Sequence, residues 1–334
     1  MNILITGGNG FIGSHTIISL REHYPHARLV IADNLTNSTL ETFTNLKKLV
    51  KEGIEFYNIN ICNEEEVATL FINYSFNAVI HFAGLKAVGE SVEKPLKYYR
   101  NNLISTLNLV KYCLIYDVGK FVFSSSATVY GNGESPFIES HSLLPTSNPY
   151  GETKAICERI LIDVANTNPE FCVSILRYFN PIGAHESGLI GEAPNGIPNN
   201  LMPYITKVAK GELETLHVFG NGYPTIDGTG VRDYIHIMDL ADGHVAALVN
   251  LKPGVNIYNL GTGNGTSVLQ LIDTFEKVNG VKIPYKIVNP RSGDLATIYA
   301  DARKAERELN WNAKRSIEDM CRDAWNFAKN TVTI

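Results

Sequence analysis

Gly7-Gly8-Asn9-Gly10-Phe11-Ile12-Gly13 follows the apolar run Ile3-Leu4-Ile5 and leads into the helix-spaced stretch Ser14-His15-Thr16-Ile17-Ile18. A short apolar run that breaks into glycines and resumes with helical spacing predicts a strand, a tight turn and a helix. That unit opens a dinucleotide-binding fold. Gly7 permits the sharp turn, Gly10 lets the backbone approach a pyrophosphate, and Gly13 lets the helix pack on the strand. The helix N-terminus then offers unpaired N–H groups to the anion.

A carboxylate stands at the end of the second apolar run, Val30-Ile31-Ala32-Asp33. It follows the glycines by about twenty residues, the spacing at which an acid accepts hydrogen bonds from the ribose of adenosine. The Asp33 carboxylate would repel the 2′-phosphate of NADP, because both groups are negative. We therefore expect NAD as the cofactor.

Apolar runs alternate with helix-spaced stretches as far as residue 176. We expect strands over residues 54–59, 78–82, 120–123 and 172–176, and helices over residues 40–50, 67–72, 95–116 and 149–164. This alternation implies right-handed crossovers and a doubly wound parallel sheet, so the predicted fold class is α/β of the Rossmann type. Ser124, Ser125 and Ser126 follow one of these strands and therefore point into the crevice where such sheets bind ligands.

The regular alternation fails after Arg177-Tyr178-Phe179-Asn180, where Gly, Pro and Asn crowd residues 181–200. A chain of 334 residues is long enough for two cores. We therefore divide it into an NAD-binding Rossmann domain over residues 1–180 and a smaller α/β substrate domain over residues 181–334, and allow later segments to return to the first domain.

Local signals in the second part are fewer. We expect a helix near residues 268–275 and another from Ser316, because Ser316-Ile317-Glu318-Asp319 resembles a capping box. Gly261-Thr262-Gly263-Asn264-Gly265 lacks a P-loop lysine, so we interpret it as a turn rather than a second phosphate loop.

Composition narrows the class of protein. The net charge is −5 and the lysines form no block, which argues against nucleic acid or an acidic membrane as a partner. No apolar stretch is long enough to span a bilayer. The five cysteines contain no CxxC pair, and no signal peptide precedes the first strand, so we expect a soluble, cytoplasmic protein. His81 has no second His or Cys at metal-ligand spacing, so we interpret it as a core histidine and expect no metal site.

Tyr150 and Lys154 form the pair to which we assign the chemistry. Asn148 is a suitable N-cap and Pro149 suits the first helical position, so the two side chains lie four residues apart on one helical face. A tyrosine with a pKa near ~10 is a poor base at neutral pH, but a neighbouring lysine and a cationic nicotinamide both favour the phenolate. Ser126 would align the same substrate hydroxyl. Together these groups predict oxidation of an alcohol, with hydride passing to the nicotinamide.

Several stretches resemble the extended short-chain dehydrogenase/reductase family and, within it, the UDP-glucose 4-epimerases. The stretches are spread over nearly the whole chain and are Gly7–Gly13, His81–Ser91, Ser124–Gly131, Tyr150–Lys154, Tyr178–Pro181, Pro198–Tyr204, Gly228–His236 and Arg291–Asp294. The resemblance implies that Tyr150 is the base, Lys154 its electrostatic partner and ribose anchor, and Ser126 the hydroxyl that helps to position O4. It also implies that NAD stays bound while a 4-keto sugar rotates and takes the hydride back on its other face. The expected reaction is the interconversion of UDP-glucose and UDP-galactose.

The resemblance also assigns binding residues. Those expected to contact NAD are Gly7, Gly10, Phe11, Ile12, Gly13, Asp33, Asn34, Asn37, Ser38, Asn60, Ile61, Phe82, Ala83, Gly84, Lys86, Asn101, Ser124, Tyr150, Lys154, Tyr178 and Phe179. Those expected to contact the UDP-sugar are Lys86, Ser126, Tyr150, Tyr178, Phe179, Asn180, Asn199, Asn200, Leu201, His217, Val218, Phe219, Arg232, Arg291, Asp294 and Ile298. The guanidiniums of Arg232 and Arg291 suit two phosphates. Asn60 stands where the family often has an aspartate that contacts adenine, and its amide oxygen can accept the same hydrogen bond.

Ile298 leaves the choice of sugar open. By the resemblance it lies beside the C2 substituent, where a bulky tyrosine accompanies restriction to glucose and galactose and a small residue accompanies acceptance of N-acetyl sugars. Isoleucine lies between the two in size. UDP-GlcNAc and UDP-GalNAc therefore stay an alternative to the favoured UDP-glucose and UDP-galactose.

Three further functions compete with epimerisation. A nucleotide-sugar dehydratase needs an acid near Ser126, and Ala127 and Thr128 supply none. A dehydrogenase or reductase would exchange NADH with solvent at each turnover, and a non-catalytic NAD-binding module would not need Ser126, Tyr150 and Lys154. The resemblance further suggests a homodimer through the helices near residues 95–117 and 148–166.

Overall fold

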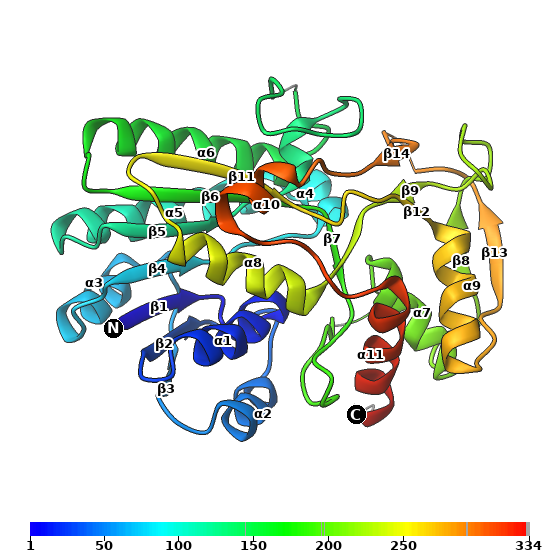
Figure 1. The fold of residues 1–334 in the computed structure, drawn as a ribbon, viewed down its shortest axis with the longest axis horizontal. Helices are drawn as coiled ribbons and strands as arrows, with labels where there is room; N and C mark the ends of the chain where they lie inside the picture. Colours follow the sequence, from blue (N-terminus) through cyan, green and yellow to red (C-terminus); the bar gives the residue numbers. More distant parts are fainter. Residues whose placement is uncertain (144, 195, 197, 292, 332–334) are drawn as a thin grey trace.

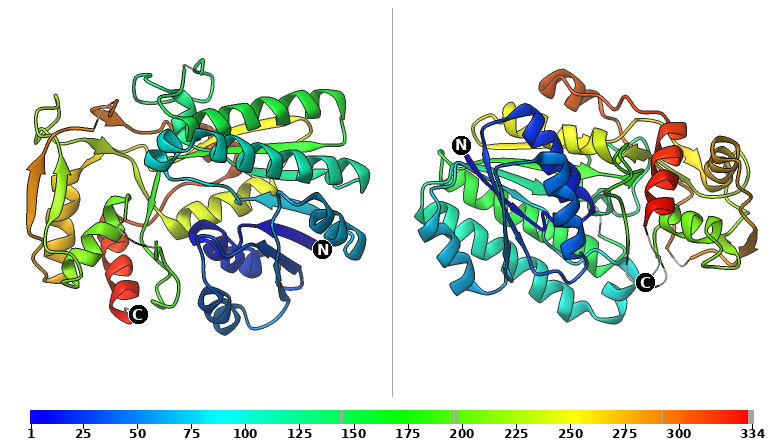
Figure 2. Two further views of the ribbon diagram at one scale, coloured as in Figure 1. Left: turned by 180° about the vertical axis from the view of Figure 1, so that it is seen from behind. Right: turned by 90° about the horizontal axis from the view of Figure 1, so that it is seen from below.

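The computed structural model describes residues 1–143, 145–194, 196, 198–291 and 293–331 (Figure 1). Ser292, within the stretch Arg291–Asp294, lies outside the described residues. A seven-stranded sheet with helices on both faces forms the larger part of the molecule, and smaller sheets with their helices lie beside it (Figures 1 and 2).

The strands of the main sheet are all parallel, in the order β11-β6-β5-β4-β1-β2-β3. Their bounds are β1 Asn2–Thr6, β2 Arg28–Asp33, β3 Ile54–Asn58, β4 Ala78–His81, β5 Lys120–Ser124, β6 Cys172–Tyr178 and β11 Val255–Leu260. The strand order reverses at β1, which pairs with β2 on one side and β4 on the other. Such a reversal opens a ligand-binding crevice at the carboxyl ends of the strands. The predicted doubly wound α/β fold is confirmed.

Helices cover both faces of this sheet, so apolar strand side chains are buried on both sides. One face packs against α1 Phe11–His23, α2 Leu40–Val50 and α8 Ile237–Val249, and the other against α3 Glu64–Asn73, α5 Pro95–Ile115 and α6 Pro149–Thr167. Strand residues alternate between the two cores, so that Ile3 and Ile5 of β1 belong to the first core and Leu4 to the second. The short helices α4 Val88–Glu93, η1 Ala127–Tyr130 and α10 Arg303–Leu309 complete the larger part.

Helix α6, which carries the predicted catalytic pair, begins where the sequence indicates. Asn148 Oδ1 accepts a hydrogen bond from Gly151 N at 2.9 Å, and Pro149 is the first helical residue. The N-cap oxygen satisfies one otherwise unpaired N–H, and proline at that position has no N–H to satisfy. The start of the helix therefore follows from local sequence alone.

His81, at the end of β4, is a core residue as predicted. Its Nδ1 lies 2.7 Å from Thr6 Oγ1 and its Nε2 lies 3.2 Å from Thr106 Oγ1, so hydroxyls partner both ring nitrogens. Burial lowers the pKa of His81 to about 3. The ring is therefore neutral at physiological pH.

The smaller part contains short strand pairs. Strand β7 Asn180–Ile182 pairs with β10 Tyr234–His236, β8 Leu216–Phe219 pairs with β13 Tyr285–Val288, and β9 Val231–Arg232 lies between β12 Thr266–Ser267 and β14 Thr297–Ile298. Helices α7 Leu201–Ala209, α9 Val268–Asn279 and α11 Ile317–Asn330 pack around a separate apolar core. The capping box predicted at Ser316 is present, because Ser316 and Asp319 exchange hydrogen bonds. The glycine-rich stretch 261–265 is a turn between β11 and β12, as predicted.

The chain returns to the main sheet after it has entered the smaller part. Strand β11 extends the sheet beside β6, with Val255 opposite Val173 and Leu260 opposite Tyr178. Helix α8 packs against α1 (Figure 1). Trp311 joins the same core. Residues far beyond 180 therefore belong to the core of the larger part, and the boundary at residue 180 stays a prediction.

Candidate active site

The glycine turn between β1 and α1 is tightly packed at Gly7 and Gly13 and less crowded at Gly10. Gly7 has a φ of +67°, a conformation that side chains disfavour. A Cβ atom on Gly13 would lie 2.5 Å from the carbonyl oxygen of Gly7, so only glycine lets the helix approach this closely. A Cβ atom on Gly10, the N-cap of α1, would approach only that carbonyl oxygen, at 3.2 Å. These features fit a dinucleotide pyrophosphate at the start of α1.

The carboxylate of Asp33 connects the glycine turn with the loop after β2. It accepts hydrogen bonds from Asn9 N at 3.1 Å, from Leu35 N at 2.9 Å and from Ser38 Oγ at 3.0 Å. Two of the residues assigned to the cofactor, Asp33 and Ser38, therefore contact each other directly, and Asn9 links Asp33 to the glycine turn. The carboxylate lies at the end of β2, the position from which an acid reaches a ribose.

Three consecutive serines at the end of β5 face three positions of α6 that are four residues apart. Ser126 interacts with the Tyr150 hydroxyl and acts to lower the pKa of that phenol. The carbonyl oxygen of Ser124 accepts a hydrogen bond from Lys154 Nζ at 2.7 Å, and Ser125 Oγ donates to Glu158 Oε1 at 2.5 Å. Residues four apart lie on one side of a helix. The strand end and α6 therefore bring Ser126, Tyr150 and Lys154 together, as the sequence predicts.

The electrostatics of Tyr150 differ from our expectation. Burial raises the pKa of the phenol above its ordinary value, and Tyr178 adds to this, while the hydrogen bond with Ser126 and the positive charge of Lys86 act in the opposite direction. We expected Lys154 to be the cation that favours the phenolate. Burial instead lowers the pKa of Lys154 to about 8, and its ammonium group is directed at the Ser124 carbonyl oxygen. The lysine that lowers the pKa of Tyr150 is Lys86.

Two buried side chains help to hold α6, the helix that carries Tyr150 and Lys154, and were not identified from the sequence. Glu158 is buried and forms an ion pair with the equally buried Arg177 of β6, with Nη2 at 2.6 Å from Oε2. Asn102 of α5 is buried as well, and its Nδ2 donates to Thr153 Oγ1 at 2.9 Å while its Oδ1 accepts from Leu85 N at 2.8 Å. The available signals were a glutamate four residues after Lys154 and an asparagine that interrupts an apolar stripe.

Residues assigned to the sugar nucleotide form three separate groups of contacts. Asn200, the N-cap of α7, donates through Nδ2 to Glu192 Oε1 at 2.7 Å, and Lys86 Nζ reaches the same oxygen at 3.0 Å. Arg232 Nη2 contacts Asp294 Oδ1 at 2.5 Å. The guanidinium of Arg291 lies 4.1 Å from the centre of the Phe219 ring. Glu192 was not identified from the sequence, although it links two of the predicted residues.

The other predicted residues occupy loops and strand ends around these groups. On the cofactor side, Phe11 and Ile12 begin α1, Asn34 and Asn37 lie in the exposed loop after β2, Asn60 and Ile61 follow β3, Phe82, Ala83 and Gly84 follow β4, and Asn101 lies on α5. On the substrate side, Tyr178 ends β6, Phe179 and Asn180 follow it, Asn199 precedes α7, Leu201 begins α7, His217 and Val218 lie on β8, and Ile298 lies on β14. The Tyr178 hydroxyl lies 2.7 Å from Ser124 Oγ, which joins two of them directly.

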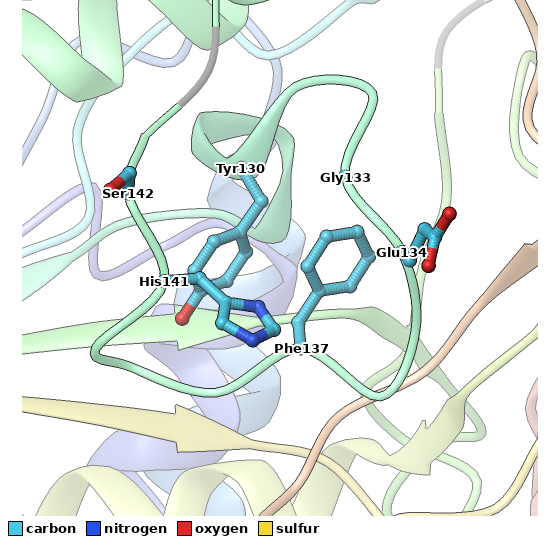
Figure 3. Close-up of a pocket in the computed structure, with 6 residues that line it drawn as sticks. All are labelled: Tyr130, Gly133, Glu134, Phe137, His141 and Ser142. Carbon is cyan, nitrogen blue, oxygen red and sulfur yellow. The ribbon is translucent and has the colours of Figure 1, made fainter.

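Outside these groups, the structure has a cavity of about 270 Å³ under the loop that follows η1 (Figure 3). Its lining residues are Tyr130, Gly133, Glu134, Phe137, His141 and Ser142, none of which was assigned to the site. In the described part of the chain, no group of three or more His, Cys, Asp or Glu residues has the arrangement of a metal site. No described helix is both long and apolar enough to cross a membrane.

Comparison with known proteins identifies the family. The sequence matches a family model described as GDP-mannose 4,6 dehydratase over residues 4–324. A UDP-glucose 4-epimerase of Bacillus subtilis is 52% identical over 334 residues, which is 99% of this chain and 98% of that protein. This chain belongs to the UDP-glucose 4-epimerases. The extended short-chain dehydrogenase/reductase resemblance seen in the sequence is thereby confirmed.

Two further UDP-glucose 4-epimerases extend the comparison. A bifunctional UDP-glucose 4-epimerase and UDP-xylose 4-epimerase 3 of Arabidopsis thaliana is also 52% identical, over 98% of this chain and 95% of its own length. The crystal structure of the Bifidobacterium longum UDP-glucose 4-epimerase in complex with NAD+ and UDP has a TM-score of 0.95 and 49% identity, with 99% of both chains covered.

The matched family model is described as a dehydratase, but the site agrees better with an epimerase. Elimination of water from a sugar needs an acid beside Ser126. The helix that follows Ser126, η1, carries only Ala127, Thr128, Val129 and Tyr130. Thr128 Oγ1 donates to Ser126 Oγ at 3.0 Å, so a neutral hydroxyl occupies the neighbouring position.

Proposed function

We propose that this protein inverts C4 of UDP-hexoses, with UDP-glucose and UDP-galactose as its substrates and NAD as its cofactor. The observation that carries the proposal is the alignment of Ser126, Tyr150 and Lys154 between β5 and α6, beside the crevice of a dinucleotide-binding sheet. Sequence identities of 52% and 49% to UDP-glucose 4-epimerases over nearly the whole chain support the same reaction.

The residues at the carboxyl ends of β1 and β2 fit NAD. The open position at Gly10 would take the pyrophosphate and the Asp33 carboxylate would accept the ribose hydroxyls, which a 2′-phosphate would prevent. Lys154 would reach the other ribose from α6. When bound, NAD supplies a positively charged nicotinamide that takes hydride from C4 and returns it.

Tyr150 would act as the proton carrier of the reaction. Its phenolate accepts the proton of the sugar O4 hydroxyl as C4 is oxidised. It returns the proton after the 4-keto sugar has rotated in the pocket. Ser126 holds the O4 atom in line with that oxygen. Burial raises the pKa of the phenol, so the phenolate needs nearby positive charge, which Lys86 and the nicotinamide would supply.

The UDP group would be held from the smaller part. Arg232 and Arg291 each present a guanidinium suited to a phosphate, and Asn200 adds an amide at the start of α7. Asp294 forms an ion pair with Arg232. The Asp294 carboxylate would therefore hold the guanidinium in place for the diphosphate. These residues lie outside the main sheet, which lets one part bind the nucleotide while the other carries out the chemistry.

Replacement of the base tests this assignment. Tyr150→Phe keeps the ring and removes the hydroxyl, so we expect the fold and bound NAD to be retained and turnover of UDP-galactose to fall by roughly two to four orders of magnitude. Tyr258→Phe, which removes a hydroxyl that donates to Glu308 outside the site, serves as the control and should keep most of the activity. Near-normal turnover by the Tyr150→Phe variant would refute the assigned base.

The size of Ile298 also favours a second pair of candidate substrates, UDP-GlcNAc and UDP-GalNAc. Its side chain is half-buried and intermediate in size, and a pocket wall of this size excludes an acetamide group only weakly. Turnover of UDP-galactose and UDP-GalNAc measured side by side distinguishes the two pairs. A preference for UDP-GalNAc would replace glucose and galactose by the N-acetyl sugars as the natural substrates.

We also propose a homodimer through the face formed by α5 and α6, which lie side by side (Figure 1). Large apolar side chains of α5 are exposed, with Leu96 82%, Leu107 48% and Ile115 57% accessible. Leu107→Glu should convert a dimer into a monomer in light scattering, since a buried charge without a partner is costly. Ile72→Glu, at an exposed position of α3, should leave the mass unchanged. A monomeric wild type would contradict this assembly.

The cytoplasm is the compartment we propose. All five cysteines are free thiols, and three of them, Cys113, Cys157 and Cys321, are buried. Free thiols persist in a reducing compartment. Fractionation of cells that express the tagged chain would test this placement, and recovery outside the cytoplasmic fraction would contradict it.

A further inference from the structure

Ser135, in the loop that follows η1, binds the backbone on both sides of Ile298. Its hydroxyl donates to the carbonyl oxygen of Thr297 at 3.0 Å and accepts from the N–H of Tyr299 at 3.1 Å. These are the two residues that flank Ile298 in the chain. One side chain therefore fixes the peptide units on either side of the residue assigned to the sugar pocket.

Further backbone contacts hold the same segment along both edges. On the edge shared with Ser135, Phe137 N donates to the Tyr299 carbonyl oxygen at 3.0 Å, and Asp301 N donates to the Phe137 carbonyl oxygen at 2.8 Å. On the opposite edge, Ile298 pairs with Arg232 of β9, and Asp233 N donates to the Ile298 carbonyl oxygen at 2.9 Å. Strand β14 is therefore held between the strand that carries a proposed phosphate ligand and the loop that carries Ser135.

The side chain of Ile298 lies in a wall close to the catalytic residues. It packs against the buried cluster Val129, Tyr130, Phe137, Ala155, Phe179 and Ala300. Ala155 directly follows Lys154 in α6, and Val129 belongs to the helix that Ser126 caps. Displacement of Ile298 would therefore change the space beside these residues.

The loop that carries Ser135 borders a cavity. The rings of Tyr130 and Phe137 stack at 4.9 Å with an angle of 17° and border the cavity of about 270 Å³ (Figure 3). A pocket wall near such a cavity can yield to a bulky ligand unless its backbone is held. The hydrogen bonds of Ser135 supply such a restraint, because they connect β14 to the loop next to the cavity.

We propose that Ser135 is a positioning residue that sets how large a sugar substituent the pocket accepts beside Ile298. The proposal rests on the proposed function, in which the sugar of a UDP-hexose lies against this wall. A wall excludes an added acetamide only when it cannot move, because binding discriminates by the difference in free energy between the two substrates. Loss of the Ser135 hydroxyl removes two restraints on the backbone and leaves Ile298 itself unchanged.

Ser135→Ala tests this role in the NAD-loaded enzyme. The quantity to measure is kcat/KM for UDP-GalNAc divided by kcat/KM for UDP-galactose. We expect this ratio to rise roughly three- to tenfold, the range for loss of about one net hydrogen bond of restraint. The main change should be a lower KM for UDP-GalNAc, while kcat for UDP-galactose stays within about twofold of the wild type.

Three variants accompany this measurement. Ser135→Thr keeps the hydroxyl and should keep the wild-type ratio, and Ser140→Ala, at an exposed serine of the same loop, should do the same. Ile298→Ala widens the pocket directly and should raise the ratio further. If Ser135→Ala is recovered unfolded, Ser135→Cys keeps the volume, weakens both hydrogen bonds and should raise the ratio in the same direction.

The outcomes separate this proposal from the proposed function. A raised ratio in Ser135→Ala, restored in Ser135→Thr, supports it. An unchanged ratio in Ser135→Ala beside a raised ratio in Ile298→Ala overturns the role of Ser135 and leaves the epimerase assignment intact. An equal loss of both activities also overturns it, since a merely structural residue would act in that way. A wild type that turns over neither sugar refutes the proposed function and removes the basis for this role.

Discussion

The buried ion pair between Glu158 of α6 and Arg177 of β6 provides the sharpest test of the structure. Glu158 and Arg177 are 1% and 3% exposed, and three contacts of 2.6 to 3.2 Å join the guanidinium to the carboxylate. Glu158→Gln keeps the shape of the side chain but removes its charge, so the arginine stays buried without a counter-ion. Breaking one side of a buried pair costs about 3–5 kcal/mol.

That cost is large relative to the whole stability of a folded domain, which is about 5–15 kcal/mol. Urea unfolding followed by circular dichroism should therefore show a clear shift in midpoint. Glu152→Gln is the matched control, because Glu152 pairs with Arg159 on the same helix at 3.0 Å, but at side-chain exposures of 33% and 55%. An exposed pair contributes about 0–1 kcal/mol, so this control should be close to the wild type.

A double variant shows whether the loss comes from the unpaired charge. Glu158→Leu combined with Arg177→Met replaces both ions with apolar side chains, and such replacements are often neutral or stabilising. We expect the double variant to be more stable than Glu158→Gln. If Glu158→Gln cost no more free energy of unfolding than Glu152→Gln, the view that this pair fixes α6 against β6 would be wrong.

Two predictions concern the dependence of stability on pH. Burial holds the pKa of Lys154 at about 8 against 10.5 for the free side chain, so between these values the unfolded chain binds more protons and the free energy of unfolding rises with pH. Lys154→Met should remove this rise, about 3 kcal/mol, when urea unfolding is compared at pH 7.5 and pH 10.5. Burial lowers the pKa of His81 from 6.5 to about 3, so its contribution to stability is lost as the pH falls through this range. Wild type should lose about 2 kcal/mol more than His81→Gln between pH 7 and pH 5, and equal losses would show that His81 is not responsible.

Much of the site was predictable because its signals are local. The N-cap Asn148 and Pro149 determine where α6 begins, and the beginning of the helix determines which side chains share a face with Tyr150. The glycine turn and Asp33 lie within the first two strands of the chain and their connection. Each of these features depends on neighbours in the sequence, so periodicity and spacing were sufficient.

The parts that could not be predicted depend on contacts between distant segments. Glu158 and Arg177 are of residue types usually found at the surface, and although Glu158 lies four residues after Lys154, no sequence signal indicates that Arg177 is its partner. The pKa of Tyr150 is raised by burial, and the opposing charge comes from Lys86 in the loop between β4 and α4. Ser135 contacts residues more than 160 positions further along the chain.

The return of the chain to its first sheet limits how this enzyme can be recombined. Strand β11 and helix α8 lie between segments of the smaller part in sequence, yet they form an edge strand and a covering helix of the larger part. A hybrid made by joining the first 180 residues to the remainder of a relative would therefore also exchange a portion of the nucleotide-binding scaffold. Transfer of sugar preference between relatives needs grafts of the separate short segments around β9 and β14, with β11 and α8 left in place.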